Sequence, residues 1–469
     1  MTYGEVSRWP HICVVPGNPR FHAFSAHYPR IGDLPGPETR NVPGAYAEGM
    51  TVVALDDTDS RERGMCTTYA AHLVAERLRE RGATVERLLL VRLNPAVEYK
   101  TRGNAALAVH VDVDPAVAFD VATDVVGANA ETADPRTNPG VVVAHERDAP
   151  DAVAEFARRA MREHLDPGEA HSLAAAHGYQ TAGWGDGRGV VGALAAVGAW
   201  PAFDDWTYEH IDYREPERWG TERRVDADSV FTAADAAYPD AWDTVDRGEG
   251  ETVCVPHTPG PILYGIRGDD LETVAWVADE IDSEPVHASQ LFVTNQGTDA
   301  HLADADLADV KDGRAYRVDV TVGGDPETRR GGHVFVPVEA DGERVQCAAF
   351  EPTKRFRDRV RALRLGDYLT VCGEVSDGTF KLEKFAVRDL VTTERETPTC
   401  PTCGNRMESA GADQGYRCRD CGTDAPGKVP RPLDRDLAVG WYEVPPCARR
   451  HVARPLVRGE WDAPVHPER

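Results

Sequence analysis

The hydrophobic pattern that follows Met50 alternates between strand-like and helix-like segments. A continuous apolar run over 51–55 predicts a buried strand, and apolar side chains at helical spacing over 67–81 predict a helix that Gly82 ends. The mixture predicts an α/β unit over 50–200. Its other expected elements are strands at 88–93 and 105–113 and a helix at 152–164.

A second unit is expected over 201–310. Its pattern predicts strands at 252–256, 262–266 and 290–295, with a helix at 271–281 between the last two. A helix enclosed between strands in this order favours a ferredoxin-like fold.

Residues 311–395 change character, because apolar and polar positions alternate with the period of two that marks half-buried strands. Five strands with a helix after the third are the plan of an OB-fold barrel, and another small β-barrel is the alternative. The expected strands are 316–322, 333–338, 344–350, 368–374 and 380–385, with a basic helix at 353–364. The chain is therefore expected to be an α+β multidomain protein.

Four cysteines form the most specific local motif of the chain. Cys400 and Cys403 make one CxxC pair, Cys418 and Cys421 make a second, and 14 residues separate the two pairs. Two such pairs supply the four thiolates of a tetrahedral zinc site. We therefore expect a zinc ribbon over 396–430, with a structural ion because all four ligand positions come from protein.

A cluster of acidic residues follows the first strand directly. Asp56, Asp57 and Asp59 place three carboxylates at a strand end, where like charges oppose one another unless a cation neutralises them. Mg²⁺ held by carboxylates and nucleotide phosphates is the usual solution. A capped surface turn in an acidic protein is the alternative.

Small and hydroxyl residues follow the carboxylates at the start of the predicted helix. Gly64, Thr67 and Thr68 belong to the segment GMCTT, and free N–H groups at a helix N-terminus bind phosphate. This segment is therefore expected to bind ATP, and a Walker A sequence occurs nowhere in the chain.

A lysine-containing loop is a further candidate phosphate site. The segment KTRGN contains Lys100, Arg102, Gly103 and Asn104, and Lys100 is one of only six lysines in the chain. A lysine kept in so lysine-poor a sequence suggests a specific phosphate contact. Residues 183–189, GWGDGRG, form a glycine-rich loop that would let a ligand approach the backbone closely.

Charge is the unusual feature of the composition. The 469 residues carry 78 acidic and 52 basic side chains, a net charge of −26. Excess carboxylate with scarce lysine is typical of proteins that stay dispersed in concentrated salt, and an acidic protein from a GC-rich genome is the alternative. Under the first interpretation, acidity does not exclude a nucleic acid partner.

Basic residues gather in two places against this acidic background. Lys354, Arg355 and Arg357 lie on the expected barrel, and Arg449 and Arg450 lie in a basic C-terminal segment, 431–469. Barrels of this kind and zinc ribbons both bind RNA, so these five residues are candidate RNA contacts. A solvated helix face is the alternative.

Several classes of protein are excluded or disfavoured. No apolar run of about 18 residues is present, so we expect no membrane-spanning helix and no membrane partner. The ten cysteines do not suggest a disulfide framework, which favours a reducing cytoplasm. Residues 1–49 carry seven prolines and no net charge, and we expect a non-native extension before Met50 or a disordered arm.

The order of motifs resembles the archaeal tRNA(Ile) 2-agmatinylcytidine synthetases. The resemblance runs from Met50 to about Leu456. Besides DDTDS, GMCTT and KTRGN, it includes RLNP at 92–95, TNPG at 137–140, FVTN at 292–295 and YEVPPCARRH at 442–451.

The resemblance implies a ligase that joins agmatine to C2 of the wobble cytidine in an isoleucine tRNA with a CAU anticodon. It implies that ATP phosphorylates the C2 oxygen and yields AMP, and that the product reads AUA codons. It also implies a kinase-like domain before the ferredoxin-like domain, and an autophosphorylated threonine at Thr67. No protein partner is inferred.

Residue roles follow from this implied chemistry. Asp56, Asp57, Asp59, Thr67 and Lys100 are the candidate catalytic residues, with Mg²⁺ on the three carboxylates. Agmatine is a dication, so its pocket needs carboxylates. The candidates for agmatine, at the interface of the first two units, are Asp269, Asp270 and Asp299. The alternatives are a non-catalytic RNA-binding protein and an RNA or nucleotide kinase that transfers no amine.

Overall fold

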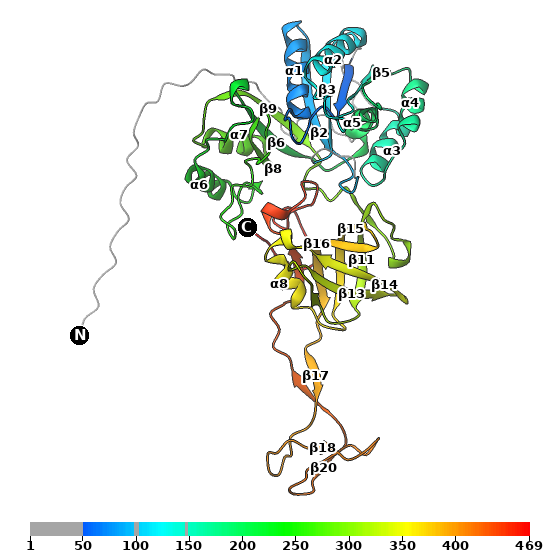
Figure 1. Cartoon of the computed structure of the whole chain (residues 1–469), viewed down its shortest axis with the longest axis vertical. Coiled ribbons are helices and arrows are strands. Elements are labelled where there is room, and N and C mark those ends of the chain that lie inside the picture. Colours follow the sequence, from blue (N-terminus) through cyan, green and yellow to red (C-terminus); the bar gives the residue numbers. More distant parts are fainter. Residues whose placement is uncertain (1–49, 98–102, 146–148) are drawn as a thin grey trace, which may run out of the picture.

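A computed structural model describes residues 50–97, 103–145 and 149–469 of the chain (Figure 1). Its upper part is built on one nine-stranded sheet in the order β5-β4-β1-β3-β2-β9-β6-β8-β7. The strands are β1 (Met50–Asp56), β2 (Thr84–Arg92), β3 (Ala105–Asp112), β4 (Gly140–Ala144), β5 (Gln180–Gly183), β6 (Thr207–Arg214), β7 (Ala241–Trp242), β8 (Ile262–Gly268) and β9 (Val286–Thr294).

Helices cover both faces of this sheet. Alternate side chains of β1 divide between two cores, Val53 and Leu55 facing α1 and α2, Val52 and Ala54 facing α3 and α5. This division explains why β1 is apolar throughout, since neither face meets water. The helices are α1 (Thr67–Glu80), α2 (Pro115–Asn129), α3 (Asp151–Ala160), α4 (Pro167–Ala176), α5 (Gly189–Ala202), α6 (Ala227–Ala237) and α7 (Leu271–Asp279).

The first two predicted units share this sheet. Strand β2 pairs in parallel with β9 through Leu89↔Val293 and Leu90↔Thr294, so hydrogen bonding continues across the expected boundary near residue 200. The predicted strands and helices of both units form within a few residues of their expected ends, with one exception. The segment 252–256, expected as a strand, is a loop in which the Cys254 N–H bonds the Thr244 carbonyl. It lines a cavity instead of joining the sheet.

The predicted five-stranded barrel is confirmed. Its strands close in the order β11-β13-β14-β16-β15-β11, with β14 and β16 parallel and the other pairs antiparallel. The expected helix is shorter than predicted, because only α8 (Phe356–Arg361) is helical, after a 3₁₀ turn over Glu351–Thr353. The barrel strands are β11 (Arg314–Val322), β13 (Val334–Ala340), β14 (Glu343–Ala349), β15 (Tyr368–Ser376) and β16 (Thr379–Asp389).

A two-stranded arm connects the barrel to a small distal sheet (Figure 1). Strands β17 (Thr393–Glu396) and β21 (Val429–Pro432) form the arm. The distal sheet contains β18 (Glu408–Ser409), β19 (Tyr416–Arg417) and β20 (Asp424–Ala425). The chain then returns to the barrel, where β22 (Gly440–Glu443) pairs with β16. In the described part of the chain, no helix is long and apolar enough to cross a membrane.

Candidate functional site

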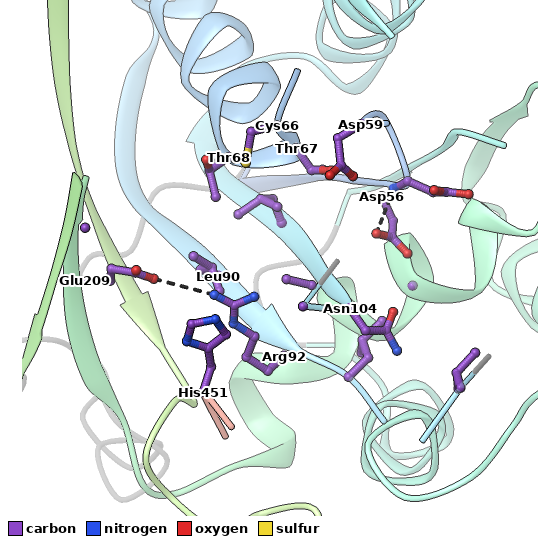
Figure 2. A pocket seen from close by; sticks show the side chains of 18 of the residues that line it. Asp56, Asp59, Cys66, Thr67, Thr68, Leu90, Arg92, Asn104, Glu209 and His451 are labelled. Carbon is purple, nitrogen blue, oxygen red and sulfur yellow. Dashed lines mark hydrogen bonds and ion pairs between the residues drawn. The ribbon is translucent and has the colours of Figure 1, made fainter. Parts of the chain in front are cut away.

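The three clustered carboxylates lie where β1 ends. The Asp57 backbone adopts a left-handed conformation, with φ of 57°, which turns the chain sharply after the strand. The Asp57 N–H donates to Asp56 Oδ1 at 2.7 Å, and the Asn138 N–H donates to Asp57 Oδ2 at 2.9 Å. Figure 2 shows Asp56, Asp59 and Thr67 gathered around this turn.

Burial leaves this cluster in need of a cation. Desolvation and the neighbouring Asp57 charge raise the pKa of Asp56 well above its ordinary value. Desolvation also raises the pKa of Asp57 to about 7, with Asp59 adding to the effect. A divalent cation would stabilise the ionised forms of all three carboxylates, and oxygen ligands of this kind suit Mg²⁺.

Two helix N-termini point to the same place. Helix α1 begins at Thr67, and no side chain caps its first N–H groups. Helix α5 begins at Gly189, again without a side-chain cap. The positive ends of both helix dipoles lie beside the carboxylates, and at α5 the Gly189, Val190 and Val191 N–H groups already donate to backbone carbonyls. Gly140 and Gly189 pack backbone to backbone, since a Cβ on Gly140 would lie 2.1 Å from the Gly189 carbonyl carbon.

A cavity of about 960 Å³ opens at this point. Its lining comes from the β1–α1 turn, the start of α5, strands β2, β6 and β8, the 251–258 loop and the C-terminal segment after the ribbon. Residues far apart in sequence thus share one site at the junction of the two halves of the sheet.

The structure brings together most of the residues predicted for ATP and metal binding. The residues that line the cavity are Asp56, Asp57, Asp59, Thr67, Thr68, Gly103 and Asn104. Gly64 instead closes the turn below the cluster, where its N–H donates to the Ser60 carbonyl at 3.2 Å. Lys100 and Arg102 lie outside the described residues.

The structure places the three predicted agmatine carboxylates away from this cavity, each with a partner of its own. Asp269 accepts hydrogen bonds from Trp242 and Arg458. Asp270 caps helix α7 by accepting from the Thr273 N–H at 2.8 Å. Asp299 forms a buried ion pair with Lys384, with an Nζ–Oδ2 distance of 2.8 Å. The structure thus gives each of these carboxylates a role in folding.

The five predicted RNA contacts are engaged within the chain. Arg449 is buried and pairs with Asp243 and Glu443, and it lines the cavity rather than the surface. The other partners are Glu249 for Lys354, Asp246 and Glu468 for Arg355, the Gly332 carbonyl for Arg357, and Glu374 and Glu383 for Arg450. Acidic partners offset all five charges, since Arg357 Nη2 also lies 3.8 Å from Glu351 Oε1, and the RNA-binding role of these residues stays a prediction.

The far wall of the cavity was not predicted as a site. It contains Arg92 from β2, Glu209 from β6 and His451 from the C-terminal segment (Figure 2). Arg267 from β8 also lines the cavity. Desolvation at the cavity wall and the charges of Arg92 and Arg267 lower the pKa of His451 well below its ordinary value, so its ring is neutral near pH 7. Arg92 and His451 stand in motifs that carry the family resemblance, which was the available signal.

The distal sheet brings the four motif cysteines together. Their Sγ atoms all lie within 4.8 Å of one another, with Cys400–Cys421 and Cys403–Cys418 separations of 3.4 Å. Both CxxC turns close in the same way, since Gly404 and Gly422 donate to the Cys400 and Cys418 carbonyls. Four converging thiols fit a tetrahedral zinc ion.

Family models match three parts of the chain. The TiaS TCKD domain matches residues 52–115, the TiaS FLD domain matches residues 187–301, and the TiaS C-terminal zinc ribbon domain matches residues 397–437. The last match confirms the predicted ribbon.

Full-length relatives are also similar. The isoleucine tRNA 2-agmatinylcytidine synthetase TiaS of Haloquadratum walsbyi is 52% identical over 90% of this chain and 100% of its own length. That of Methanosarcina mazei is 45% identical over 87% of this chain and 97% of its own length.

Solved structures match the same extent of the chain. A complex of TiaS with its isoleucine tRNA and ATP is 41% identical, with a TM-score of 0.82 over 90% of this chain and 100% of that one. A complex of TiaS with the same tRNA, AMPCPP and agmatine is 38% identical, with a TM-score of 0.80 over 90% of this chain and 100% of that one. The chain therefore belongs to the TiaS family of isoleucine tRNA 2-agmatinylcytidine synthetases.

Proposed function

We propose that this protein is an ATP-dependent ligase that attaches agmatine to C2 of the wobble cytidine of the CAU-anticodon isoleucine tRNA. The proposal rests on the cavity that joins an acidic turn to two helix N-termini without side-chain caps, in a chain 52% identical to a named synthetase over that relative's full length. Relatives have been captured with this tRNA, with ATP and with agmatine. Transferring one phosphoryl group of ATP to the C2 oxygen converts a poor leaving group into a good one, and the agmatine amine then displaces it as phosphate. Transfer of the second phosphoryl group to Thr67 would account for AMP.

We assign the predicted domains to this function as follows. Residues 50–200 form the kinase-like domain, 201–310 the ferredoxin-like domain, 311–395 the OB-fold, 396–430 the zinc ribbon and 431–469 the basic C-terminal segment. The matched family domains at 52–115 and 187–301 support the first two assignments, although the second match begins before residue 201. The strand order of the barrel supports the third.

The acidic turn would hold Mg²⁺ through Asp56, Asp57 and Asp59. When bound, this ion neutralises phosphate charge during phosphoryl transfer. The protein's own contribution is positional, because the Asp57 and Asn138 N–H groups fix the two carboxylates nearest the strand.

The ATP phosphates would lie against the N-termini of α1 and α5. Thr67 is the first residue of α1, and its Oγ1 lies 3.2 Å from Thr58 Oγ1 inside the site. This position suits the phosphate-accepting threonine that the family resemblance implies. Lys100 and Arg102 remain candidate phosphate contacts.

Agmatine would lie within the same cavity. Since Asp269, Asp270 and Asp299 are engaged elsewhere, we infer that carboxylates on the cavity wall balance its two positive charges. Glu163, Asp186 and Glu251 line the cavity outside the metal cluster and outside the far wall.

The barrel and ribbon would hold the tRNA. The arm carries the ribbon away from the nine-stranded sheet, on the other side of the barrel (Figure 1), which suits a grip on an extended RNA. The net charge of −26 and the relative from Haloquadratum walsbyi favour activity in concentrated salt, where counterion release contributes little to affinity. We expect a cytoplasmic protein.

The decisive experiment incubates the purified protein in high salt with Mg²⁺, ATP, labelled agmatine and a transcript of the CAU-anticodon isoleucine tRNA. We expect label on the wobble cytidine and none when ATP is omitted. ATP consumption without labelled RNA would indicate a kinase that transfers no amine. RNA binding without either reaction would indicate a non-catalytic RNA-binding protein.

The ribbon gives a second expected result. Cys400→Ser should lower zinc affinity by more than the roughly 10- to 100-fold that loss of an outer-shell partner costs, because a direct ligand is removed. Zinc content after dialysis against a chelator measures this, and filter binding measures the expected fall in tRNA affinity. Ser409→Ala, an exposed change in the same ribbon, is the control. Unchanged tRNA affinity in zinc-free Cys400→Ser would remove the ribbon from the RNA grip.

A further inference from the structure

Two oppositely charged side chains stand together on the far wall of the cavity. Arg92 ends β2 and Glu209 lies in β6, and the β2–β9–β6 pairing brings them to one place. Arg92 Nη2 and Glu209 Oε2 are 3.9 Å apart, and Figure 2 shows the pair facing the interior opposite the acidic turn. The proposed chemistry at the acidic turn gives neither residue a role.

A third side chain fixes this pair. Gln296 Oε1 accepts from Arg92 Nε at 3.2 Å and from Arg92 Nη2 at 3.0 Å. Gln296 Nε2 donates to Glu209 Oε2. Both side chains are thus held in place from one side, which is how a binding site is preorganised.

Each charged group keeps one polar atom for a ligand. Within the described residues, Glu209 Oε1 and Arg92 Nη1 make no hydrogen bond, although both side chains line the cavity. Because both residues line the cavity, a ligand bound there can supply the missing partners.

Glycine keeps the space beside each of these atoms open. A Cβ on Gly265 would lie 2.7 Å from Glu209 Oε1, and a Cβ on Gly103 would lie 2.4 Å from Arg92 Nη1. Both glycines also line the cavity. Absence of a side chain at both points lets a planar ligand edge approach the pair.

An acceptor next to a donor complements one pyrimidine and opposes the other. Cytosine presents a 4-amino donor beside the N3 acceptor, whereas uracil presents an O4 acceptor beside an N3–H donor. A carboxylate accepts from the cytosine 4-amino group, and a guanidinium donates to N3. With uracil, the carboxylate would face the O4 acceptor and the guanidinium would face the N3–H donor, so neither hydrogen bond could form.

The placement of the pair also gives the base a direction. Along the Watson–Crick edge of cytosine, the 4-amino group, N3 and O2 follow in order. In Figure 2, Arg92 lies between Glu209 and the wall that bears Asp56 and Thr67. A base with its amino group at Glu209 and N3 at Arg92 therefore points O2 toward the acidic turn, where phosphoryl transfer is proposed.

We propose that Glu209 and Arg92 read the Watson–Crick edge of the extruded wobble base, so that this pair selects cytidine over uridine and orients its C2 oxygen. This inference rests on the proposed function, since it needs an RNA base in the cavity. Enzymes that act on an extruded base commonly read that edge by hydrogen bonds and stack on its faces.

His451 suits the stacking role. Its ring stands beside Arg92 in the cavity, where a Cβ on Gly103 would lie 3.4 Å from its Cδ2. The charged groups that face it are Arg92 from β2 and Arg267 from β8, with Glu209 beyond Arg92. Desolvation and the two guanidinium neighbours lower the pKa of the imidazole, and a neutral ring favours a stacked aromatic face over a second cation.

The test compares wobble bases in otherwise identical isoleucine tRNA transcripts. The preference for cytidine over uridine in kcat/KM should fall by roughly ten- to a hundred-fold in Glu209→Gln, since an amide can donate to O4 of uracil. The exposed Glu280→Gln should keep the wild-type preference. An unchanged preference in Glu209→Gln, together with a raised KM for agmatine, would overturn the proposal and make Glu209 an agmatine ligand.

A second measurement uses the unaltered protein, so that a folding defect in the variant cannot decide the matter. The wobble nucleotide is replaced by one with a pyrimidin-2-one base, which is cytosine without its 4-amino group. We expect kcat/KM to fall by roughly ten- to a hundred-fold. A change within about two-fold would overturn the proposal, and no product with cytidine itself would instead overturn the proposed function.

Discussion

Asp56→Asn is expected to lower the rate of agmatine transfer by roughly a hundred- to a thousand-fold while tRNA binding is retained. The substitution keeps the size of the side chain and removes one of the three charges that would bind Mg²⁺. Asp56 lies at the end of β1, inside the cavity, and its pKa is raised by burial and by Asp57. Single-turnover assays with labelled agmatine, alongside filter binding of tRNA, separate the two effects.

Asp112→Asn is the matched control. Asp112 is exposed at the opposite end of the same sheet, where it pairs in register with Met50. We expect its activity to stay close to wild type. Activity of Asp56→Asn within a few-fold of wild type would remove Asp56 from the phosphoryl-transfer site.

Although Asp56→Asn should lower activity, it should raise the stability of the folded protein. Burial raises the pKa of Asp56 well above its ordinary value and that of Asp57 to about 7, so the folded protein binds protons more tightly than the unfolded chain between about pH 4 and pH 7. Without Mg²⁺, the stability that these groups contribute in the wild type therefore falls as the pH rises through that window. Above pH 7, Asp56→Asn should unfold at a higher temperature than wild type, and added Mg²⁺ should narrow the difference.

The acidic turn could be predicted because all its parts are close in sequence. Asp56, Asp57, Asp59 and Thr67 lie within one strand–turn–helix unit, and local spacing determines where such side chains point. The barrel was predictable for a similar reason, since each strand carries the alternation that one buried face imposes.

The far wall could not be predicted in this way. Arg92, Glu209 and His451 come from two strands and a segment beyond the ribbon, and only the β2–β9 pairing and the returning chain bring them together. No pattern along a single sequence specifies that pairing. The boundary expected near residue 200 is likewise not a break in the structure, because strands from both sides of it join one continuous hydrogen-bonded sheet.

The three candidate agmatine carboxylates all have partners within the chain, and their role stays a prediction. Asp270 follows Asp269 at the start of a predicted helix, and its N-cap bond to Thr273 accounts for its position. Asp299, in the segment that follows β9, forms a buried ion pair with Lys384 of the barrel strand β16. One of the few lysines of the chain therefore serves this contact. Charge in a sequence does not distinguish a ligand site from such contacts until the partners are known.

Gly192→Ala is expected to reduce agmatine transfer by about a hundred-fold without loss of the fold. Gly192 lies in the first turn of α5 and faces the acidic turn. A Cβ there would lie 1.9 Å from Asp56 Oδ2, so the carboxylate must move, and a displacement of about 1 Å at a reacting centre costs about this factor. Alanine favours the helix itself, which opposes any loss of stability.

Gly127→Ala provides the control for Gly192→Ala. Gly127 lies in α2, and a Cβ there meets no atom within 4 Å, so this change should leave activity intact and stabilise the protein by roughly 0.5–1 kcal/mol. Combining Gly192→Ala with Asp56→Asn should cost little more than Asp56→Asn alone, because both changes act on one carboxylate. Fully additive losses would show that Gly192 acts through a group other than Asp56, such as Leu93, the next nearest side chain at 3.0 Å.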